Sequence, residues 1–335
     1  MLKHASHPDI RPRRLRRLPF LRQLVSETTL TSADLIAPFF IQETLSEPTP
    51  IPSMPGVYRY SLEGLLKQAE LCQQLHIPAI ALFPVIPKEQ KSLLAEEAYN
   101  PHGFIQRAIR LVKQHFPDLG LITDVALDPY TLHGHDGIID ETGRVMNDAT
   151  VAILTKQALA QADSGVDIVA PSDMMDGRIG AIRGGLEAAG FHDTCILSYA
   201  VKYASTFYGP FREAVGSAPA LGGRDKKHYQ MDPANTNEAL REVALDLQEG
   251  ADIVMVKPGM PYLDVLWRVK EAFQVPTFAY QVSGEYTMLQ AAVLQGWLST
   301  GCIEEALLSL KRGGADAIFT YFATTIAKQL HPNYN

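Results

Sequence analysis

Two lysines that end strongly apolar segments are the residues of this sequence best suited to chemistry on a carbonyl group. Lys202 ends the segment Ser198-Tyr-Ala-Val-Lys202, and Lys257 ends Ile253-Val-Met-Val-Lys257. Burial disfavours the charged amine and lowers its pKa from about 10.4 by up to several units. Only a neutral amine attacks a carbonyl carbon, so such lysines form Schiff bases. Each lysine alone also fits a surface group whose stem lies along a strand, but the pair favours an active site.

Acidic and imidazole side chains gather after another apolar segment. Asp124, Asp128 and Asp136 occur there together with His133 and His135. Singly, such acids are usually helix caps or ion-pair partners, but their crowding favours a polar site with acid/base groups. Other polar residues at the ends of apolar segments are Ser172, Asp173, Ser283 and Tyr321.

A long connection follows Lys202 and runs from Tyr208 to Pro233. Segments of this length without secondary structure are uncommon in compact domains unless they act as lids. This one is basic and suits a substrate carboxylate, although a solvated surface loop is the alternative. Its basic residues are Arg212, Arg224, Lys226 and Lys227.

Eight apolar, β-branched segments alternate with helix-length segments along the chain, which predicts a parallel sheet covered by helices. Eight such units close a (β/α)8 barrel, whose active site lies at the C-terminal ends of the strands. An open, doubly wound α/β sheet is the alternative. The predicted strands are Leu35–Gln42, Ala79–Val85, Leu121–Asp128, Val166–Ser172, Ile196–Lys202, Asp252–Pro258, Thr277–Ser283 and Ala315–Tyr321, and the clearest helices are Ser61–Leu75, Phe104–Phe116, Asn237–Glu249 and Tyr262–Phe273.

A short repeat supports this architecture. The runs Gly165-Val-Asp, Gly250-Ala-Asp and Gly314-Ala-Asp each precede a predicted strand. Helices often end at a left-handed residue, which glycine adopts without a Cβ penalty. We therefore expect three equivalent joints between a helix and a strand.

The composition is that of a well-packed globular protein, with 46% hydrophobic residues among 335 and a net charge of -7. This charge disfavours nucleic-acid binding through overall electrostatics. No apolar run is long enough to cross a membrane, and three scattered cysteines indicate neither disulfides nor a cysteine zinc site. We expect a cytoplasmic enzyme that acts on a small molecule.

The N-terminal region is the one basic block, with six arginines and no acid between Arg11 and Arg22. A transit peptide would also be rich in arginine, but this block lacks serine enrichment and is interrupted by Pro12 and Pro19. We expect an extended arm over residues 1–33 that lies on the protein or on a neighbouring subunit, followed by a catalytic barrel over 34–335.

Several motifs together resemble the porphobilinogen synthase family. The most specific is Gly250-Ala-Asp-Ile-Val-Met-Val-Lys257-Pro-Gly-Met-Pro-Tyr262, which is similar to the family's Schiff-base motif. Further agreement, in the same order, spans roughly residues 34–322. It includes Asp124 to Gly137, Ala170 to Gly180, Ser198 to Tyr203, Tyr208 to Arg212 and Tyr280 to Tyr286.

The resemblance implies a (β/α)8 barrel enzyme that condenses two 5-aminolevulinate molecules to porphobilinogen in tetrapyrrole (heme or chlorophyll) synthesis. It implies that Lys257 binds the first substrate, with its carboxylate at Ser283 and Tyr321. Lys202 then binds the second, with its carboxylate at Arg212 and Lys226. It assigns supporting positions to Ser172 and Gln230, leaves Asp124, Asp128 and Asp136 as acid/base candidates, and implies an octamer whose arms embrace neighbouring subunits.

The resemblance also bears on metals. Zinc-type members carry three cysteines where this chain has Ala126, Asp128 and Asp136, and carboxylates suit harder ions than thiolates do. We therefore expect no active-site zinc. The resemblance also implies an allosteric magnesium ion bound at Glu242, with Asp173 as an outer partner.

Three other functions compete with this interpretation. A class I aldolase also uses a Schiff-base lysine, but it would leave Lys202 without a role. A metal-dependent hydrolase could use His133, His135 and an aspartate, but its lysines would be idle. A barrel that only binds a ligand is the third alternative.

Overall fold

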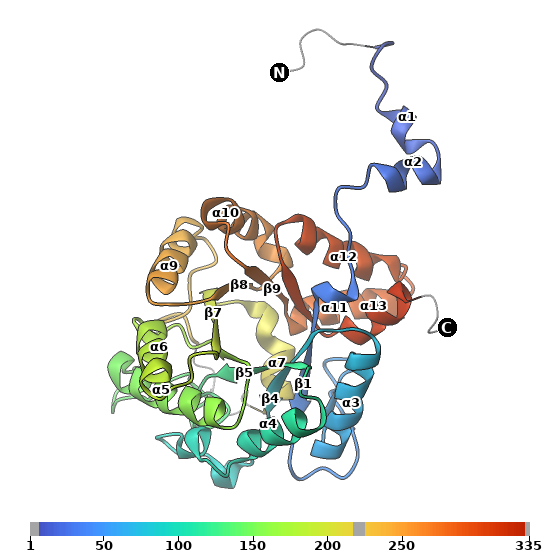
Figure 1. Cartoon of the computed structure of the whole chain (residues 1–335). Coiled ribbons are helices and arrows are strands. Elements are labelled where there is room, and N and C mark those ends of the chain that lie inside the picture. The colour runs from blue at the N-terminus through green and yellow to red at the C-terminus, as the bar shows by residue number, and fades with distance from the viewer. Residues whose placement is uncertain (1–6, 217–224, 332–335) are drawn as a thin grey trace.

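The protein is a closed parallel barrel surrounded by helices, as the computed structural model describes it for residues 7–216 and 225–331 (Figure 1). Within these residues, eight strands pair in the order β10-β9-β8-β7-β6-β5-β4-β1, and β10 pairs with β1 to close the ring. This closure excludes the open doubly wound sheet and confirms the (β/α)8 barrel. The barrel strands are β1 (Leu35–Ile41), β4 (Ala79–Pro84), β5 (Gly120–Val125), β6 (Ile168–Pro171), β7 (Cys195–Lys202), β8 (Ile253–Lys257), β9 (Thr277–Gln281) and β10 (Ala317–Thr320).

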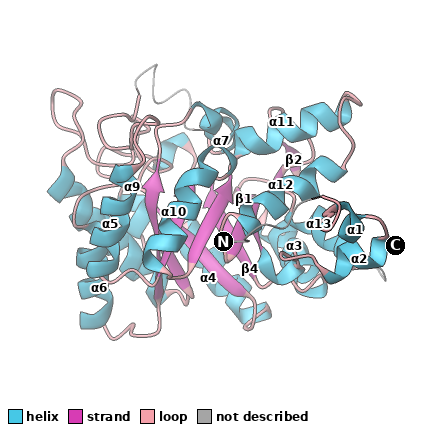
Figure 2. Ribbon diagram, turned by 90° about the horizontal axis from the view of Figure 1, so that it is seen from above, coloured by secondary structure: helices cyan, strands magenta, loops and turns pink. Residues whose placement is uncertain are grey.

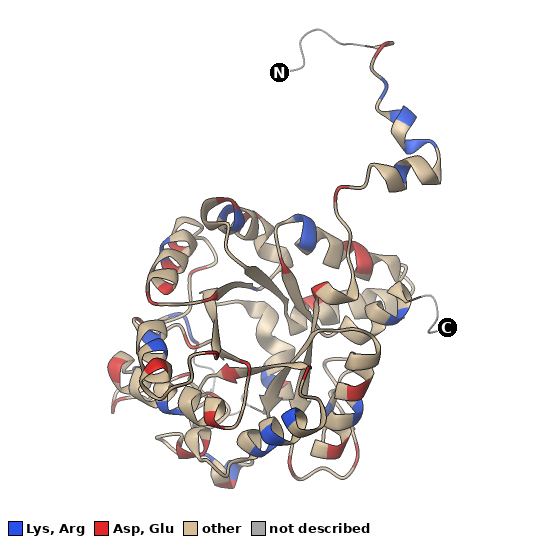
Figure 3. Ribbon diagram, viewed as in Figure 1, with Lys and Arg blue, Asp and Glu red and all other residues tan. Residues whose placement is uncertain are grey.

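Helices cover the outside of the barrel (Figure 2). They are α3 (Leu62–Gln74), α4 (Phe104–His115), α5 (Asn147–Asp163), α6 (Arg178–Ala188), α9 (Asn237–Gln248), α10 (Leu263–Phe273), α11 (Ser283–Leu294), α12 (Gly301–Arg312) and α13 (Ala323–Leu330). The coloured charges lie mainly on these helices and on the loops, while the barrel strands are largely uncharged (Figure 3). The strands are covered by helices outside and by packed side chains inside, and this burial on both faces explains why their sequences are almost continuously apolar.

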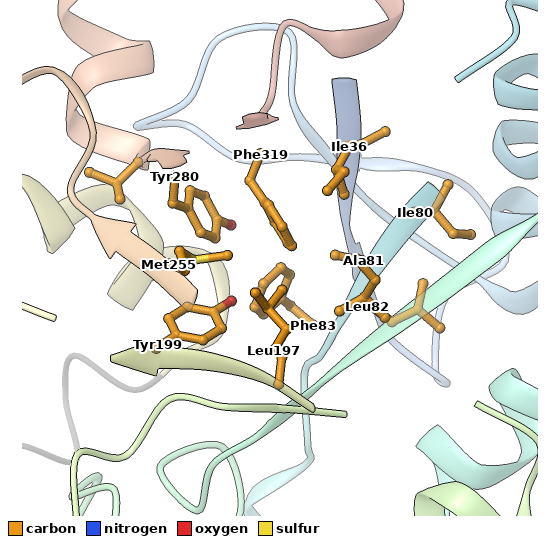
Figure 4. Packing of buried hydrophobic residues seen from close by; sticks show 14 of the residues in the cluster. Ile36, Ile80, Ala81, Leu82, Phe83, Leu197, Tyr199, Met255, Tyr280 and Phe319 are labelled. Carbon is orange, nitrogen blue, oxygen red and sulfur yellow. The ribbon is translucent and has the colours of Figure 1, made fainter. Parts of the chain in front are cut away.

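Large side chains fill the inside of the barrel (Figure 4). Phe319 of β10 packs against Tyr280 of β9 with ring centroids 5.1 Å apart, and Tyr280 lies 6.5 Å from Tyr199 of β7. All three are essentially buried. The barrel is thus a packed core, and only its mouth is available for chemistry.

The predicted glycine joints are present. Gly165, Gly250 and Gly314 have φ angles of +94°, +103° and +109°, so each occupies the region that favours glycine. The aspartate two residues after each glycine has a shared role. Asp252 accepts a hydrogen bond from the Ile196 N–H at the start of β7 (2.7 Å) and pairs with Arg183 of α6, the helix before that strand (2.5 Å). The same contacts join Asp167 to Leu121 and Lys113, and Asp316 to Thr277 and Lys270.

Several predicted boundaries need correction. The strand predicted over Leu121–Asp128 ends at Val125, because the chain turns there: Tyr130 and Thr131 both donate to the Leu127 carbonyl. The strand predicted up to Ser283 ends at Gln281, and Ser283 begins α11. A small hairpin of β2 (Thr49–Pro50) and β3 (Tyr58–Tyr60) adds to β1 outside the barrel and was not predicted.

The N-terminal segment lies away from the barrel (Figure 1). It contains the short helices α1 (Arg13–Arg16) and α2 (Pro19–Leu24), neither of which has a buried residue. None of the helices in the described parts of the chain has the length and apolar character needed to cross a bilayer.

Candidate active site

Lys202 and Lys257 lie directly side by side. They end β7 and β8, and the two strands pair with Lys202 opposite Lys257. Side chains at paired positions of neighbouring strands point to the same face. The register shifts between Ser198 and Val201, which indicates a bulge in β7 just before the lysine. Both lysines are buried, with 6% and 7% exposure.

Lys257 sits in an aromatic cage. Its Nζ lies 4.5 Å from the ring centre of Tyr280, 4.8 Å from Tyr199, 5.3 Å from Phe211 and 5.5 Å from Tyr208. Burial, together with the neighbouring charge of Lys202, lowers the pKa of Lys257 to about 7, against the opposing effect of the aspartates. A substantial fraction of Lys257 is therefore the neutral nucleophile at neutral pH.

Lys202 has more polar surroundings. Its Nζ donates to the Ser172 carbonyl oxygen and lies 3.7 Å from Asp136 Oδ2. The two lysines thus face different environments although they are neighbours. The two amines can therefore play different chemical roles.

The three aspartates also differ from one another. Lys226 Nζ lies 3.0 Å from Asp136 Oδ1 and 3.4 Å from Asp128 Oδ2. Burial would raise the pKa of Asp136, but Lys202 and Lys226 outweigh it and hold this pKa well below its usual range. Burial raises the pKa of Asp128 to about 6 and also raises the pKa of Asp124, although lysines oppose both shifts. Asp136 is therefore a fixed anion, and Asp128 and Asp124 are the better proton donors.

One cavity at the barrel mouth collects most of the residues predicted for the site. Tyr208 and Phe211 of the aromatic cage also line it. The predicted residues on its wall are Asp124, Asp128, Asp136, Ser172, Lys202, Arg212, Lys226, Gln230 and Lys257.

Ser283 and Tyr321 do not line this cavity and lie one contact behind it. Ser283 Oγ accepts a hydrogen bond from the Phe211 N–H at 2.9 Å. The Tyr321 hydroxyl is 3.0 Å from the hydroxyl of Tyr280, whose ring belongs to the cage. Phe211 thus separates Ser283 from the cavity, and Tyr280 separates Tyr321 from the Lys257 amine.

The long connection after β7 contains a helix that was not predicted. It is α7 (Gly209–Ala214), which carries Phe211 and the half-buried Arg212. Arg59 of β3 holds the end of α7, because its guanidinium donates to the carbonyls of Ala214 (2.7 Å) and Glu213 (2.8 Å). Arg224, also predicted for this connection, lies outside the described residues.

The aromatic cage was missed from the sequence. Its members come from β7, β9 and the α7 region, and only the barrel closure brings them together. A usable signal existed for Tyr199 and Tyr280, since each is an aromatic residue three positions before the polar end of a predicted strand.

Glu242 lies outside the cavity that holds the lysines. It is half-buried on α9 and lines a neighbouring pocket of about 630 Å³, to which Gln230 and Tyr229 also contribute. Burial raises the pKa of Glu242, and Arg178 opposes this shift. Gln230 lines both cavities, and the Tyr229 hydroxyl accepts a hydrogen bond from the Asp136 N–H at 3.2 Å.

Asp173, predicted as an outer partner of a metal at Glu242, is buried and pairs with Arg178 at 3.6 Å. The described residues hold no group of three or more His, Cys, Asp or Glu side chains placed to bind a metal ion. A hydrolase site built from His133, His135 and an aspartate is therefore not formed among them.

These features define a class of protein: a (β/α)8 barrel enzyme with adjacent buried lysines suited to Schiff-base chemistry on carbonyl substrates. Residues 9–329 match the family described as Delta-aminolevulinic acid dehydratase. The chain therefore belongs to the delta-aminolevulinic acid dehydratase family.

Individual relatives agree with this family. The dehydratase of Bradyrhizobium diazoefficiens is 54% identical over 322 residues, which is 96% of this chain and 91% of that protein. The dehydratase of Rhodobacter capsulatus is 52% identical over 96% of both chains. A crystal structure of the Toxoplasma gondii enzyme, also described as porphobilinogen synthase and bound to its product porphobilinogen, is 50% identical. The two structures match with a TM-score of 0.94 over 98% of this chain and 92% of the Toxoplasma gondii chain.

Proposed function

We propose that this enzyme condenses two molecules of 5-aminolevulinate to porphobilinogen with loss of two waters. The observation that carries this proposal is the direct pairing of Lys202 with Lys257 at one barrel mouth. Each substrate has one keto group, so two amines can bind two keto groups side by side. A class I aldolase needs a single such lysine and leaves Lys202 without a role.

The two lysines would divide the work. Lys257, with its lowered pKa, binds the first substrate, whose carboxylate meets Ser283 and Tyr321. Lys202 binds the second, whose carboxylate meets Arg212 and Lys226, with Ser172 and Gln230 supporting that site. Each iminium withdraws electrons from its substrate, so one substrate loses a proton from carbon and the other accepts the attack. Asp124 and Asp128 supply and remove protons, and Asp136 keeps Lys202 and Lys226 in place.

Trapping with borohydride tests this assignment. Reduction in the presence of 5-aminolevulinate should leave a stable adduct on Lys257, and Lys257→Ala should abolish turnover. Because only the neutral amine reacts, the trapping rate should rise about tenfold per pH unit below pH 7 and level off above it. Peptide mapping that found the adduct solely on a loop lysine such as Lys227, or a midpoint near the ordinary lysine pKa, would contradict the proposal.

We further propose that magnesium bound at Glu242 activates the enzyme from outside the active site and that no zinc is needed at Asp128 and Asp136. Magnesium keeps most of its waters and needs only one or two carboxylates, so half-buried Glu242 is a sufficient ligand. Asp128 and Asp136 already have Lys226 as a cationic partner. The wall shared through Gln230 and Tyr229 offers a route from Glu242 to the active site.

We also propose that the chain assembles as a homo-oligomer, an octamer built through the arm, and acts in the cytoplasm. The arm exposes apolar side chains at Leu15, Phe20, Leu24 and Val25, which suit burial against another subunit. Cys72, Cys195 and Cys302 are free thiols, which fits a reducing compartment. A relative from Physcomitrium patens, 52% identical over 96% of this chain, is described as chloroplastic.

A further inference from the structure

A fully buried carboxylate near the site, Glu285, has no part in the roles assigned above. It is the third residue of α11, and its oxygens accept three backbone hydrogen bonds. Oε2 accepts from Val282 at 2.8 Å and from Gly259 at 3.2 Å, and Oε1 accepts from Met260 at 2.6 Å. Burial raises the pKa of Glu285 to about 7, and these amides oppose the shift. A buried carboxylate held only by backbone groups ties separate chain segments together.

The segments that Glu285 joins carry two parts of the first-substrate site. Gly259 and Met260 directly follow Lys257 and Pro258, so they set where β8 leaves the barrel. Val282 precedes Ser283, the residue that begins α11. Glu285 therefore holds the end of the Schiff-base strand against the first turn of the helix that presents Ser283.

Close backbone packing shows how tightly this region is fitted. A Cβ added at Gly259 would lie 3.1 Å from the Tyr280 carbonyl oxygen. A Cβ added at Gly284 would lie 2.5 Å from the Phe207 carbonyl oxygen. Gly259 and Gly284 are thus both pressed against other backbone, and the carboxylate of Glu285 accepts hydrogen bonds from both segments between which they lie.

We propose that Glu285 is a positioning residue that fixes the Lys257 amine relative to the Ser283 hydroxyl, so that both ends of the first substrate are bound at once. The inference rests on the proposed function, in which Lys257 takes the keto group and Ser283 the carboxylate. When the Lys257 amine and the Ser283 hydroxyl are held at a fixed separation, binding of the substrate carboxylate places the keto carbon next to the amine. The rate of Schiff-base formation then rises.

Glu285→Gln tests this role because the amide keeps the size of the side chain but turns an NH₂ group toward backbone N–H donors. At least one charge-assisted hydrogen bond is lost, which corresponds to a factor of about 10 to 100. The substitution should reduce the increase in rate that the substrate carboxylate gives. It should change the reactivity of the Lys257 amine much less.

The experiment compares borohydride trapping at Lys257 by 5-aminolevulinate and by aminoacetone, an amino ketone without the carboxylate. In the unmodified enzyme, 5-aminolevulinate should react much faster. In Glu285→Gln, the ratio of the two rates should fall about 10- to 100-fold while the aminoacetone rate changes little. Ser283→Ala should lower the same ratio. Asp34→Asn, which alters a buried carboxylate that accepts the Thr31 N–H at the opposite end of the barrel, should leave the ratio unchanged.

An unchanged ratio in a folded Glu285→Gln enzyme, or equal falls for both ketones, would overturn the inference while leaving the proposed function intact. Failure of the unmodified enzyme to form any Lys257 adduct would overturn both. If Glu285→Gln does not fold, Glu285→Asp keeps the charge with a shorter reach, and its ratio should fall to an intermediate value. A ratio in Glu285→Asp equal to that of the unmodified enzyme would count against the inference.

Discussion

At the scale of single residues, the site separates groups that the sequence presents as equivalent. Lys202 and Lys257 both end apolar strands, yet one lies beside Asp136 and the other inside an aromatic cage. Asp128 and Asp136 share Lys226, yet their pKa values move in opposite directions. Such separation of titrating groups is how a single pocket holds both acids and bases at one pH.

The two cations predicted to bind the second carboxylate should behave differently on removal. Arg212 is half-buried on α7. Arg212→Ala should mainly weaken the binding of the second substrate, by about 1.5–3 kcal/mol for a lost charge-assisted hydrogen bond. Quantifying adducts on Lys202 and Lys257 against substrate concentration measures this. The Lys202 adduct should require about 10- to 100-fold more substrate, and the Lys257 adduct should not. Unchanged substrate dependence at both lysines would remove Arg212 from the clamp.

Lys226→Ala should cost stability as well as affinity, because it leaves the buried Asp128 and Asp136 short of a cation. Breaking a buried ion pair typically costs about 3–5 kcal/mol. The pKa of Asp136 is lowered in the folded protein, so its paired charge contributes stability above its unfolded pKa, and this contribution is lost in acid. Denaturant unfolding should therefore show the largest difference from the unmodified enzyme at neutral pH and a smaller one below about pH 4.

At the scale of elements, the glycine-aspartate joints fix where helices end and strands begin. Gly165→Ala should cost about 1–2 kcal/mol for a left-handed residue with a Cβ, since nothing lies within 4 Å of the added atom. Gly314→Ala should cost more, because its Cβ would lie 2.8 Å from Lys270 Cβ. Gly184→Ala, within α6 and also in open space, should be neutral or stabilising by up to about 1 kcal/mol. Unfolding midpoints that do not follow this order would contradict the joint interpretation.

The elements were predictable where the chain is periodic and less so where it is not. All eight barrel strands were found because apolar runs mark them locally, and glycine joints mark three of them as well. Ser283 was predicted to end a strand, but it begins α11. The local sequence did not indicate that the Glu285 carboxylate accepts the Val282 N–H and so caps a helix there. The cage and the contact of Lys226 with Asp136 depend on segments distant in sequence, since 90 positions separate the latter pair. Residue types indicated the site, and only the closed barrel determines which side chains meet.

At the scale of the whole molecule, the arm is the feature least explained by one chain. Its apolar residues Leu15, Phe20, Leu24 and Val25 are exposed, and its helices α1 and α2 lie apart from the barrel in Figure 1. Replacing Phe20 and Leu24 together with serine should leave the barrel folded and reduce the size of the assembly, as measured by sedimentation velocity. Replacing Arg13 and Arg14 with serine is the matched control, because it changes charge but keeps the apolar face. An assembly of unchanged size in the first variant would show that the arm does not hold subunits together.

The proposed magnesium activation belongs to this same scale, because it would connect the outer pocket to the active site. A proton competes with a metal ion for the Glu242 carboxylate, and burial raises the pKa of Glu242, so activation should strengthen as pH rises.

Activity should survive zinc-selective chelation, rise with millimolar magnesium, and lose that rise in Glu242→Ala. Glu271→Ala, an exposed acid on α10 outside the pocket, is the control and should keep it. Gln230 lines both cavities, and Tyr229 of the outer pocket accepts a hydrogen bond from Asp136 of the inner one. The magnesium effect should therefore appear in turnover as well as in substrate binding. Loss of activity on zinc removal, restored by zinc and not by magnesium, would instead place a zinc ion among Asp128, Asp136 and their neighbours.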